Sequence, residues 1–416
     1  MIETKFKQTE LGPIPEDWQA HTIEDLIIAM NDGPFGTKLK QEHYTSKREA
    51  RIIQLGNIGE DGWIDSNVKY TTFEYAKHLS NHIANPGDVL IAKMMPAGRA
   101  IICPDHEACF VQGSDAIKVK FNDSINARYF VYGTKSREYL RIIEENTQGS
   151  TRQRIAITKY KALPFILPPK EEQIKIADAL SDIDGLIREI NVLIEKKVAV
   201  MQGSIQELLS ARHRLPGFSI PWKHIILGDT VNIYRGGSPR PIENFITTNP
   251  NGLNWIKIGD VRPKDKYIVQ TAEKIIPEGL SSTREVHVGD FILSNSMSFG
   301  RPYILKIDGC IHDGWLAITN YENTFDKDYL YYLLGSDSVY KQYLSLAAGS
   351  GVLNLNKKLV AAVELDIPDI EEQLAIAAIL SDMDAEITEL ETKRDKYAAI
   401  RQGMMQQLLT GKIRLI

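Results

Sequence analysis

An internal repeat constrains this chain more than any other feature of its sequence. Residues 171–215 begin EEQIKIADALSDIDGLI and residues 371–415 begin EEQLAIAAILSDMDAEI, so a shift of 200 positions relates them without a gap. The two segments are identical at 20 of 45 positions. A repeat of this length predicts two copies of one structural unit. The identical pairs include Glu171/Glu371, Gln173/Gln373, Ser181/Ser381, Asp182/Asp382, Asp184/Asp384, Gln202/Gln402 and Leu208/Leu408.

The repeat continues more weakly upstream of each segment. GDVLIAKMMPAGRA (87–100) matches GDFILSNSMSFGRP (289–302), and Trp18 matches Trp222. The long segments are better preserved than the parts before them, so they are expected to share one role while the two modules perform different versions of another. We therefore predict a first module at 1–168, a helix at 169–212, a second module at 213–368 and a second helix at 369–416.

Each long segment carries an apolar stripe with the alternating spacing of three and four residues that is typical of a coiled coil. Helices of about 40 residues would be roughly 60 Å long. Each is expected to start after its proline, and Asp369 and Glu372 have the spacing of a capping box. Lys197, Arg394 and Arg401 fall on the stripe, where they either extend their charges to solvent or fix the register of the pair. The predicted seam residues are Ile176, Leu180, Ile183, Ile187, Ile190, Ile194, Ile376, Leu380, Met383, Ile387, Leu390 and Tyr397.

The modules have the pattern of mixed α/β (α+β) domains. Short strand-like runs such as 88–94, 116–121 and 254–261 alternate with Gly, Pro and Asn turns. A helical stretch follows in each module, at 127–146 and 328–346. The predicted fold is therefore two α/β modules with a pseudo-twofold internal repeat, joined by two long helices.

Composition excludes several classes of protein. The chain has 416 residues, of which 43% are hydrophobic and 25% charged, as in a globular protein. It has no apolar run long enough to span a bilayer, its start lacks a signal-peptide core, and three cysteines cannot form a disulfide framework. A cytoplasmic location is expected.

The net charge of −5 lies entirely in the predicted helices. Residues 169–212 carry 6 basic and 8 acidic residues, and residues 369–416 carry 6 and 9, whereas both modules are neutral. Within the modules, Lys and Arg gather beside Gly, Ser and Thr, a composition that suits phosphate contacts and bidentate reading of guanine. Arg99 and Arg301, which follow the repeated Gly98 and Gly300, and Lys257 are candidates outside these patches. The full set of candidate DNA-contact residues is Thr37, Lys38, Lys40, Arg99, Arg152, Arg154, Arg235, Arg240, Lys257 and Arg301.

A search for catalytic chemistry yields no constellation of residues. GPFGTK (33–38) lacks the spacing of a phosphate loop and is expected to be a turn. Cys103, His106 and Cys109 would need a fourth ligand to hold zinc, so we expect them to pack instead. No catalytic residues and no metal site are predicted for this chain.

The junction after each module resembles the specificity subunits of type I restriction-modification enzymes. That family has a Gly-Ser pair, then I-P-P-x-x-E-Q, then I-A-x-x-L-x-x-x-D, and this chain shows the pattern at 149–184 and again at 349–384. The second copy has Pro368-Asp369 in place of the double proline. The turns at 31–40 and 235–241 also resemble the openings of the family's recognition domains. The resemblance covers essentially the whole chain.

The resemblance implies a function. Each module would be a target-recognition domain that reads one half of a bipartite sequence in double-stranded DNA. The helices would form an antiparallel coiled coil that sets the length of the unread spacer. Two methyltransferase subunits would dock on the chain and methylate adenine with S-adenosylmethionine, and two motor-nuclease subunits that require ATP and Mg²⁺ would be able to join. The chain itself would bind no cofactor and would take part in phage defence without being an enzyme.

Other classes of protein remain as alternatives. A fused nuclease or methyltransferase would need catalytic motifs that the sequence lacks. A coiled-coil adaptor would bind no DNA, and a stand-alone DNA-binding regulator would need no partner subunits. The bases read, the spacer length and the surface that docks the methyltransferases cannot be deduced from the sequence.

Overall fold

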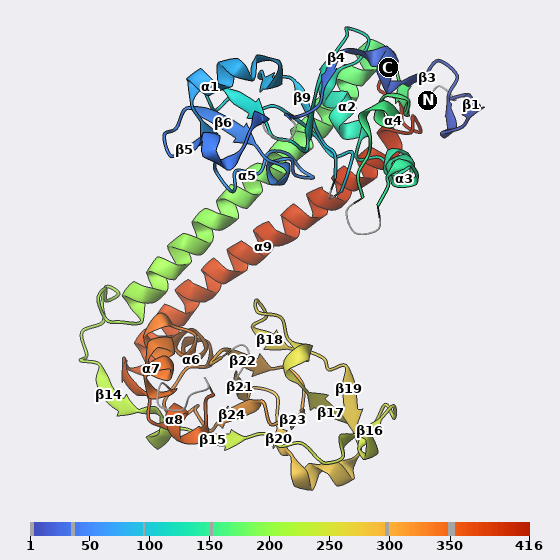
Figure 1. Cartoon of the computed structure of the whole chain (residues 1–416). Helices are drawn as coiled ribbons and strands as arrows, with labels where there is room; N and C mark the ends of the chain where they lie inside the picture. Colours follow the sequence, from blue (N-terminus) through green and yellow to red (C-terminus); the bar gives the residue numbers. More distant parts are fainter. Residues whose placement is uncertain (1–3, 35–37, 95, 150–152, 296–298, 348–353) are drawn as a thin grey trace. The chain divides into compact units, whose positions relative to one another are not determined.

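The computed structural model describes residues 4–34, 38–94, 96–149, 153–295, 299–347 and 354–416 (Figure 1). The chain forms two compact units. Unit 1 comprises residues 1–190 and 393–416, and unit 2 comprises residues 191–392. Each unit therefore combines one module with a part of both long helices. The fourfold division predicted from the sequence describes the repeat, whereas the compact units cut across the two helices.

The long helices are α5 (Lys170–Leu208) and α9 (Ile370–Leu408), each of 39 residues. Asp369 caps α9, because its Oδ1 accepts a hydrogen bond from the backbone N–H of Glu372 at 3.0 Å. The capping box is not closed, since the Glu372 carboxylate is bound to other side chains. The first turns of α5 and the last turns of α9 share the core of unit 1, and the opposite ends share the core of unit 2. The helices therefore run antiparallel within each unit.

The predicted seam residues lie on the covered face of these helices. Ile187, Met383, Leu390 and Tyr397 are half-buried. Two of the charged seam residues form ion pairs with the other helix: Lys197 with Glu386 at 2.5 Å, and Arg401 with Asp184 at 2.5 Å. Both pairs tie one helix to a fixed position on the other. The fully buried seam residues are Ile176, Leu180, Ile183, Ile190, Ile194, Ile376, Leu380 and Ile387.

Among the described residues, the module of unit 1 contains two larger sheets and two two-stranded sheets, β1-β2 and β13-β3. One larger sheet has the strand order β10-β9-β12-β4 and the other β5-β7-β6-β11-β8, in which β6 and β11 are parallel. Its helices are α1 (Phe73–His78), α2 (Ala127–Gly133), α3 (Arg137–Asn146) and α4 (Ile157–Lys161). Its strands are β1 (Phe6–Thr9), β2 (Gly12–Pro15), β3 (Gln19–Thr22), β4 (Ile27–Asn31), β5 (Tyr44–Thr45), β6 (Ala50–Ile53), β7 (Tyr70–Thr71), β8 (Ile83–Ala84), β9 (Val89–Ala92), β10 (Ala100–Ile102), β11 (Phe110–Gln112), β12 (Ala116–Phe121) and β13 (Pro164–Leu167).

The module of unit 2 repeats this arrangement. Its larger sheets have the orders β15-β24-β21-β22-β18 and β16-β19-β17-β23-β20, and β17 is parallel to β23. A two-stranded sheet pairs β14 with β25. Its helices are α6 (Lys327–Leu334), α7 (Asp337–Ala347) and α8 (Lys357–Ala361). Its strands are β14 (Lys223–Ile226), β15 (Asn232–Arg235), β16 (Ile246–Thr247), β17 (Leu253–Ile256), β18 (Tyr267–Ile268), β19 (Glu273–Ile275), β20 (Arg284–Val286), β21 (Phe291–Ser294), β22 (Pro302–Leu305), β23 (Gly309–Ile311), β24 (Trp315–Thr319) and β25 (Glu364–Ile367).

Apolar side chains form two large layers in each module, and a smaller cluster includes Val111 in unit 1 and Trp255 in unit 2. One layer lies between the two sheets and contains residues such as Leu90 and Phe110 in unit 1 and Ile292 and Trp315 in unit 2. The other lies between one sheet and the helices. In Figure 1, α2, α3 and α4 of unit 1 lie beside the start of α5 and the end of α9, and their side chains form one core. Each predicted helical stretch in the modules is two helices with a short break between them.

The repeated Gln of the E-E-Q motif joins each long helix to its module. Gln373 is 1% exposed, and its Nε2 donates to the carbonyls of Thr324 and Pro368 at 3.0 and 3.1 Å. Its Oε1 accepts from the backbone N–H of Asp326 at 2.9 Å. Gln173 makes the same three hydrogen bonds in unit 1. Each amide thus satisfies buried backbone groups that would otherwise be unpaired.

The repeated Glu of the same motif closes each unit at the same end of the helix, through contacts with the segment that follows the other long helix. Glu172 is 3% exposed and accepts hydrogen bonds from Trp18 Nε1 at 2.9 Å and from Arg414 Nε at 2.8 Å. In unit 2, Glu372 accepts from Trp222 and from Arg214. Each arginine follows the C-terminus of the opposite long helix. The motif therefore locks the start of one helix to the segment that follows the other.

Across the described ranges, no helix is both long enough and apolar enough to cross a lipid bilayer. The long helices alternate charged and apolar positions throughout.

Candidate nucleic-acid interface

The ends of four strands of the first module meet at one edge of its two sheets. Gly113, after β11, donates its N–H to the carbonyl of Ile53 at the end of β6 at 2.8 Å. Gln112 Nε2 donates to the carbonyl of Asn31 at the end of β4 at 3.1 Å. Lys93, after β9, donates its N–H to the carbonyl of Asp115 at 3.0 Å. We call this region, with residues 31–33, 53–54, 93–94, 112–115 and 154, the strand-end edge of module 1.

Charged side chains gather at this strand-end edge. Lys93 Nζ lies 2.7 Å from Asp32, and the two side chains are 6% and 20% exposed. Arg154 forms an ion pair with Asp115 and bridges Met94 through the backbone. Burial of His82, whose Nδ1 lies 3.0 Å from the Asp32 carbonyl, lowers its pKa. The edge thus presents cations beside hydrogen-bond acceptors, the mixture that contacts phosphates and base edges.

The second module has an equivalent edge with different side chains. The backbone N–H of His312 donates to the carbonyl of Ile256 at 3.1 Å, and the backbone N–H of Asn295 donates to the carbonyl of Gly314 at 3.0 Å. These two hydrogen bonds are equivalent to those that the backbone N–H groups of Gly113 and Lys93, respectively, donate in module 1. Asn295 Nδ2 also donates to the carbonyl of Asp313 at 2.8 Å. Residues 235–237, 256–257, 294–295 and 311–314 form this strand-end edge of module 2.

A groove of about 790 Å³ adjoins the strand-end edge of module 2. Arg240 and Lys257 line it together with Trp255 and His312. Lys257 Nζ lies 2.7 Å from Glu273, and Arg240 lies 3.6 Å from Asp313. The groove combines the exposed guanidinium of Arg240 and the half-buried ammonium of Lys257 with the imidazole ring of His312, so it can accept an anionic ligand such as a nucleic acid.

The structure places most of the predicted DNA-contact residues close to these edges. Thr37 and Arg152 lie outside the described residues. Lys38 and Lys40 are exposed in the segment that follows β4, where Lys40 lies 3.6 Å from Glu42. Arg235 is exposed at the end of β15. With Arg154, Arg240 and Lys257, these residues lie near the strand ends of their modules.

Arg99 and Arg301 lie elsewhere in their modules. Each follows a glycine with a positive φ (Gly98 at 82°, Gly300 at 73°) in the turn between equivalent strands, as the repeat predicts. The Arg301 side chain lines a pocket together with residues of α5 and α9. Burial lowers the pKa of Arg99, and the nearest acidic charge that opposes this is Glu60. Arg301 therefore faces the long helices, whereas Arg99 is partly buried and close to Glu60.

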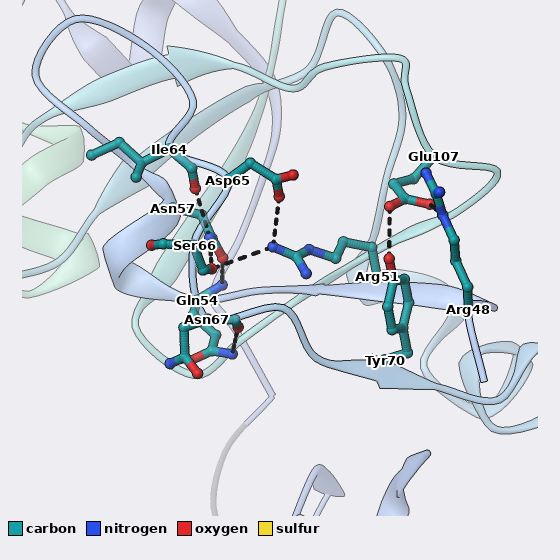
Figure 2. Close-up of polar contacts among 10 residues, drawn as sticks. All are labelled: Arg48, Arg51, Gln54, Asn57, Ile64, Asp65, Ser66, Asn67, Tyr70 and Glu107. Atoms are coloured by element: carbon teal, nitrogen blue, oxygen red, sulfur yellow. Dashed lines mark hydrogen bonds and ion pairs between the residues drawn. The ribbon is translucent and has the colours of Figure 1, made fainter. Parts of the chain in front are cut away.

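The polar residues that support the strand-end edge of module 1 were not predicted from the sequence. Arg51 of β6 is buried and contacts Asp65 at 3.0 Å (Figure 2). Its guanidinium also lies within 6 Å of the centres of the Trp63 and Tyr70 rings. Asn57 donates to the carbonyls of Ile64 and Ser66. These contacts hold the loop 54–67 against β6. A single arginine in the apolar run ARII was the only signal in the sequence.

In the part of the chain that the structure describes, no three His, Cys, Asp or Glu side chains lie close enough together to hold a metal ion. Cys103 and Cys310 are buried, and burial raises the pKa of their thiols to about 12 and about 11. A thiol with such a pKa is neither a ready nucleophile nor a ready ligand.

Comparisons with known proteins agree with this architecture. A family described as type I restriction modification DNA specificity domain matches residues 15–196 and 220–398. The type I restriction enzyme MjaVIII specificity subunit of Methanocaldococcus jannaschii is 24% identical over 99% of this chain and 97% of its own length. The crystal structure of the S subunit of a type I restriction-modification system from M. genitalium superposes with a TM-score of 0.60 at 17% identity, covering 97% of this chain and 98% of that one. A chain from a structure on complex assembly and conformational transition of the type I R-M system gives a TM-score of 0.62 at 16% identity, with 96% and 99% covered.

Proposed function

This chain belongs to the family of type I restriction modification DNA specificity domains, and from that premise we propose that each module reads one half of a bipartite target in double-stranded DNA. The chain is the non-catalytic specificity subunit of such a system. Its strand-end edges supply the contacts to DNA, and its long helices fix the distance between the two half-sites.

One observation carries this proposal. The two strand-end edges have the same backbone hydrogen bonds but different side chains, so that Lys93 corresponds to Asn295 and Gly113 to His312. Both side chains are buried and support their edges differently, because Lys93 pairs with Asp32 whereas Asn295 donates to the carbonyl of Asp313. Two copies of one scaffold with different edges are therefore suited to reading two different short sequences.

The paired helices support the role of a spacer. A continuous helix of 39 residues is about 58 Å long at the α-helical rise. The ion pair between Lys197 and Glu386 ties α5 to α9 in one register within unit 2. Such a pair holds its length, whereas a flexible linker would not. We infer that this length determines the number of unread base pairs between the half-sites.

The remaining components of the system would be partner subunits. We propose that two methyltransferase subunits dock on the chain and methylate adenine with S-adenosylmethionine, and that motor-nuclease subunits using ATP and Mg²⁺ join them in the cytoplasm. In this scheme the chain binds no cofactor of its own. It recognises the DNA sequence and provides the surface on which the other subunits assemble.

Replacing Arg154 with alanine is expected to weaken DNA binding by the assembled methyltransferase about tenfold. Arg154 is exposed at the strand-end edge and is paired with Asp115, a partner that a phosphate can replace. The slope of log K against log salt should become shallower by about 1. Fluorescence anisotropy at several salt concentrations measures both quantities. Arg141→Ala, on the exposed face of α3, is the matched control. An unchanged slope for Arg154→Ala would remove this residue from the interface.

Deleting four residues, about one helical turn, from the middle of α5 is expected to shorten the spacer by one or two base pairs. Both half-site sequences should stay the same, because neither strand-end edge contains residues of α5. Methylation mapping by long-read sequencing measures the half-sites and the spacer together. Alanine substitutions at the same positions keep the length and serve as the control. A change in the bases read, with the spacer constant, would contradict the role of the helices.

The proposed function as a whole is tested by mapping adenine methylation in cells with and without this gene, with the methyltransferase present in both. We expect a gapped, two-part adenine motif that disappears when the gene is deleted. If every methylation motif persisted after deletion of the gene, in a strain shown to make both proteins before the deletion, the result would contradict the proposal. It would favour a coiled-coil adaptor that binds no DNA.

A further inference from the structure

A network of charges joins the long helices to the module in unit 1. Arg401 of α9 lies 2.5 Å from Asp184 of α5 and donates from Nη2 to Asp61 at 2.8 Å. Tyr132 of α2 donates its hydroxyl to Asp184 at 2.8 Å, and Lys135 lies 3.4 Å from Asp61. Two cations thus balance two carboxylates at the place where the module rests on the helices.

The equivalent place in unit 2 lacks one of these cations. The repeat relates Asp184 to Asp384 and Arg401 to Met201. Lys266 lies over the ring of Tyr332, as Lys135 lies over the ring of Tyr132 in unit 1. The ammonium of Lys266, however, lies 2.9 Å from Asp328. Among the described residues, the Asp384 carboxylate has no hydrogen bond or ion pair. Burial raises the pKa of Asp384, and the nearby charge of Lys266 offsets this increase only in part.

An open pocket occupies the space that an arginine at position 201 would fill. It has a volume of about 630 Å³, and Met201 and Asp384 both line it. Tyr331, Tyr332 and Phe299 provide aromatic walls. Arg301 also lines this pocket, but its charge acts on Tyr331, whereas Lys266 and Glu391 are the charged groups that act on Asp384.

The chemistry of the pocket selects its occupant. A half-buried carboxylate prefers a planar, doubly donating cation, and aromatic faces attract a guanidinium more than other cations. The matching position of unit 1 already holds a guanidinium against the equivalent carboxylate. A pocket of this size also accommodates the alkyl stem of an arginine, which Phe299 and Met201 would cover.

We propose that this pocket of unit 2 binds an arginine side chain presented by a partner protein, with Asp384 as its counter-ion. The partner's arginine would complete in unit 2 the arrangement that Arg401 completes within unit 1. The pocket is then a docking point on one half of the chain only, so it would make the two halves of a pseudo-symmetric subunit distinguishable to a partner.

The first experiment uses N-acetyl-arginine N-methylamide as the probe, with NMR of the full chain labelled with ¹³C at its methionine methyls. We expect saturable shifts of the Met201 methyl, with an affinity in roughly the millimolar range. Asp384→Asn should weaken this binding about tenfold. Asp184→Asn, the same change in the closed network of unit 1, should leave it unaltered. The lysine analogue of the probe should bind more weakly. Absence of saturable shifts, or equal affinity for Asp384→Asn, overturns the proposal.

The second experiment tests the partner protein and rests on the proposed function. Met201→Arg should fill the pocket and weaken assembly with the methyltransferase subunit at least about tenfold, because it supplies internally the cation that the partner would bring. Val200→Arg places the same charge on the exposed side of α5, where Val200 is 57% exposed, and should assemble normally. Unchanged assembly of Met201→Arg overturns the docking role. Absence of any complex with the unaltered chain would instead contradict the proposed function, and the probe experiment would still decide whether the pocket binds arginine.

Discussion

A chain that ends at Leu408 is expected to lose the folded structure of unit 1 while unit 2 stays folded. The missing residues 409–416 include Leu409, which is 5% exposed in the core of unit 1, and Arg414, which pairs with Glu172. Loss of a buried leucine costs roughly 1.5–3 kcal/mol. A buried carboxylate that loses its partner costs about 3–5 kcal/mol. Together these losses approach the whole stability of a typical domain, which is about 5–15 kcal/mol.

Unit 2 should be unaffected because residues 191–392 contain its entire compact structure. Its own closing contact, between Glu372 and Arg214, is made by residues far from the C-terminus. Hydrogen exchange followed by mass spectrometry measures the two units separately. We expect fast exchange around Trp18 and in the first turns of α5, with native protection from β15 to α7.

A chain that lacks only Ile416 is the matched control. Ile416 is 76% exposed, so its removal should change the protection of neither unit. Native protection around Trp18 in the chain ending at Leu408 would show that the C-terminal segment is not needed to close unit 1. Loss of protection in both units would show that the two units do not fold independently.

The architecture was predictable from the sequence because the residues that determine it recur at regular spacings. The 200-residue shift and the seam spacing predict two modules and two long helices, and the structure contains α5 and α9 at those positions. The strand at 116–121 coincides with β12. Such predictions succeed because periodicity and repetition depend on residues that are close in the sequence or related by one fixed offset.

The strand-end edges were only partly predictable, because they are built from residues distant in the sequence. Lys93 and Asp32 are 61 positions apart and meet only after β4, β9 and β12 have paired. No local pattern marks Lys93 as a buried cation. The exposed basic residues Arg154 and Arg240 could be predicted as DNA contacts because they lie beside Gly, Ser and Pro, which the sequence shows directly.

The E-E-Q motif shows a different limit. The sequence identifies Glu172 and Gln173 as repeated residues but does not show what they contact. Their partners lie 154 and 47 positions upstream, in Trp18 and Asn126, and 242 positions downstream, in Arg414. The structure explains the repetition, since each Glu and Gln satisfies buried groups that only its own unit supplies.

Replacing Gln373 with glutamate is expected to destabilise unit 2 by about 3–5 kcal/mol at neutral pH. The substitution preserves the shape of the side chain but replaces a donor with a charged acceptor. The amide Nε2 faces the carbonyls of Thr324 and Pro368, so a carboxylate oxygen there would meet two acceptors without a donor. The urea dependence of hydrogen exchange in α6 and in the first turns of α9 measures the change in the free energy of unfolding.

The pH dependence of the same variant separates charge from shape. Burial among acceptors should raise the pKa of the introduced carboxyl group above its unfolded value of about 4.3. The folded state then binds a proton more tightly than the unfolded state, so the deficit should shrink as the pH is lowered from neutral, until the group is protonated in both states. Gln373→Met loses the same hydrogen bonds without a charge and should show a smaller, pH-independent deficit.

Two controls locate the effect in the buried amide. Glu371→Gln, at the neighbouring exposed position, should leave both units unchanged. Gln173→Glu should produce an equal loss confined to unit 1, because Gln173 makes the equivalent bonds to Ser124, Asn126 and Pro168. A Gln373→Glu chain as stable as the original would mean that the amide can turn or that water reaches the site, and the repeated Gln would then need an explanation other than its three hydrogen bonds.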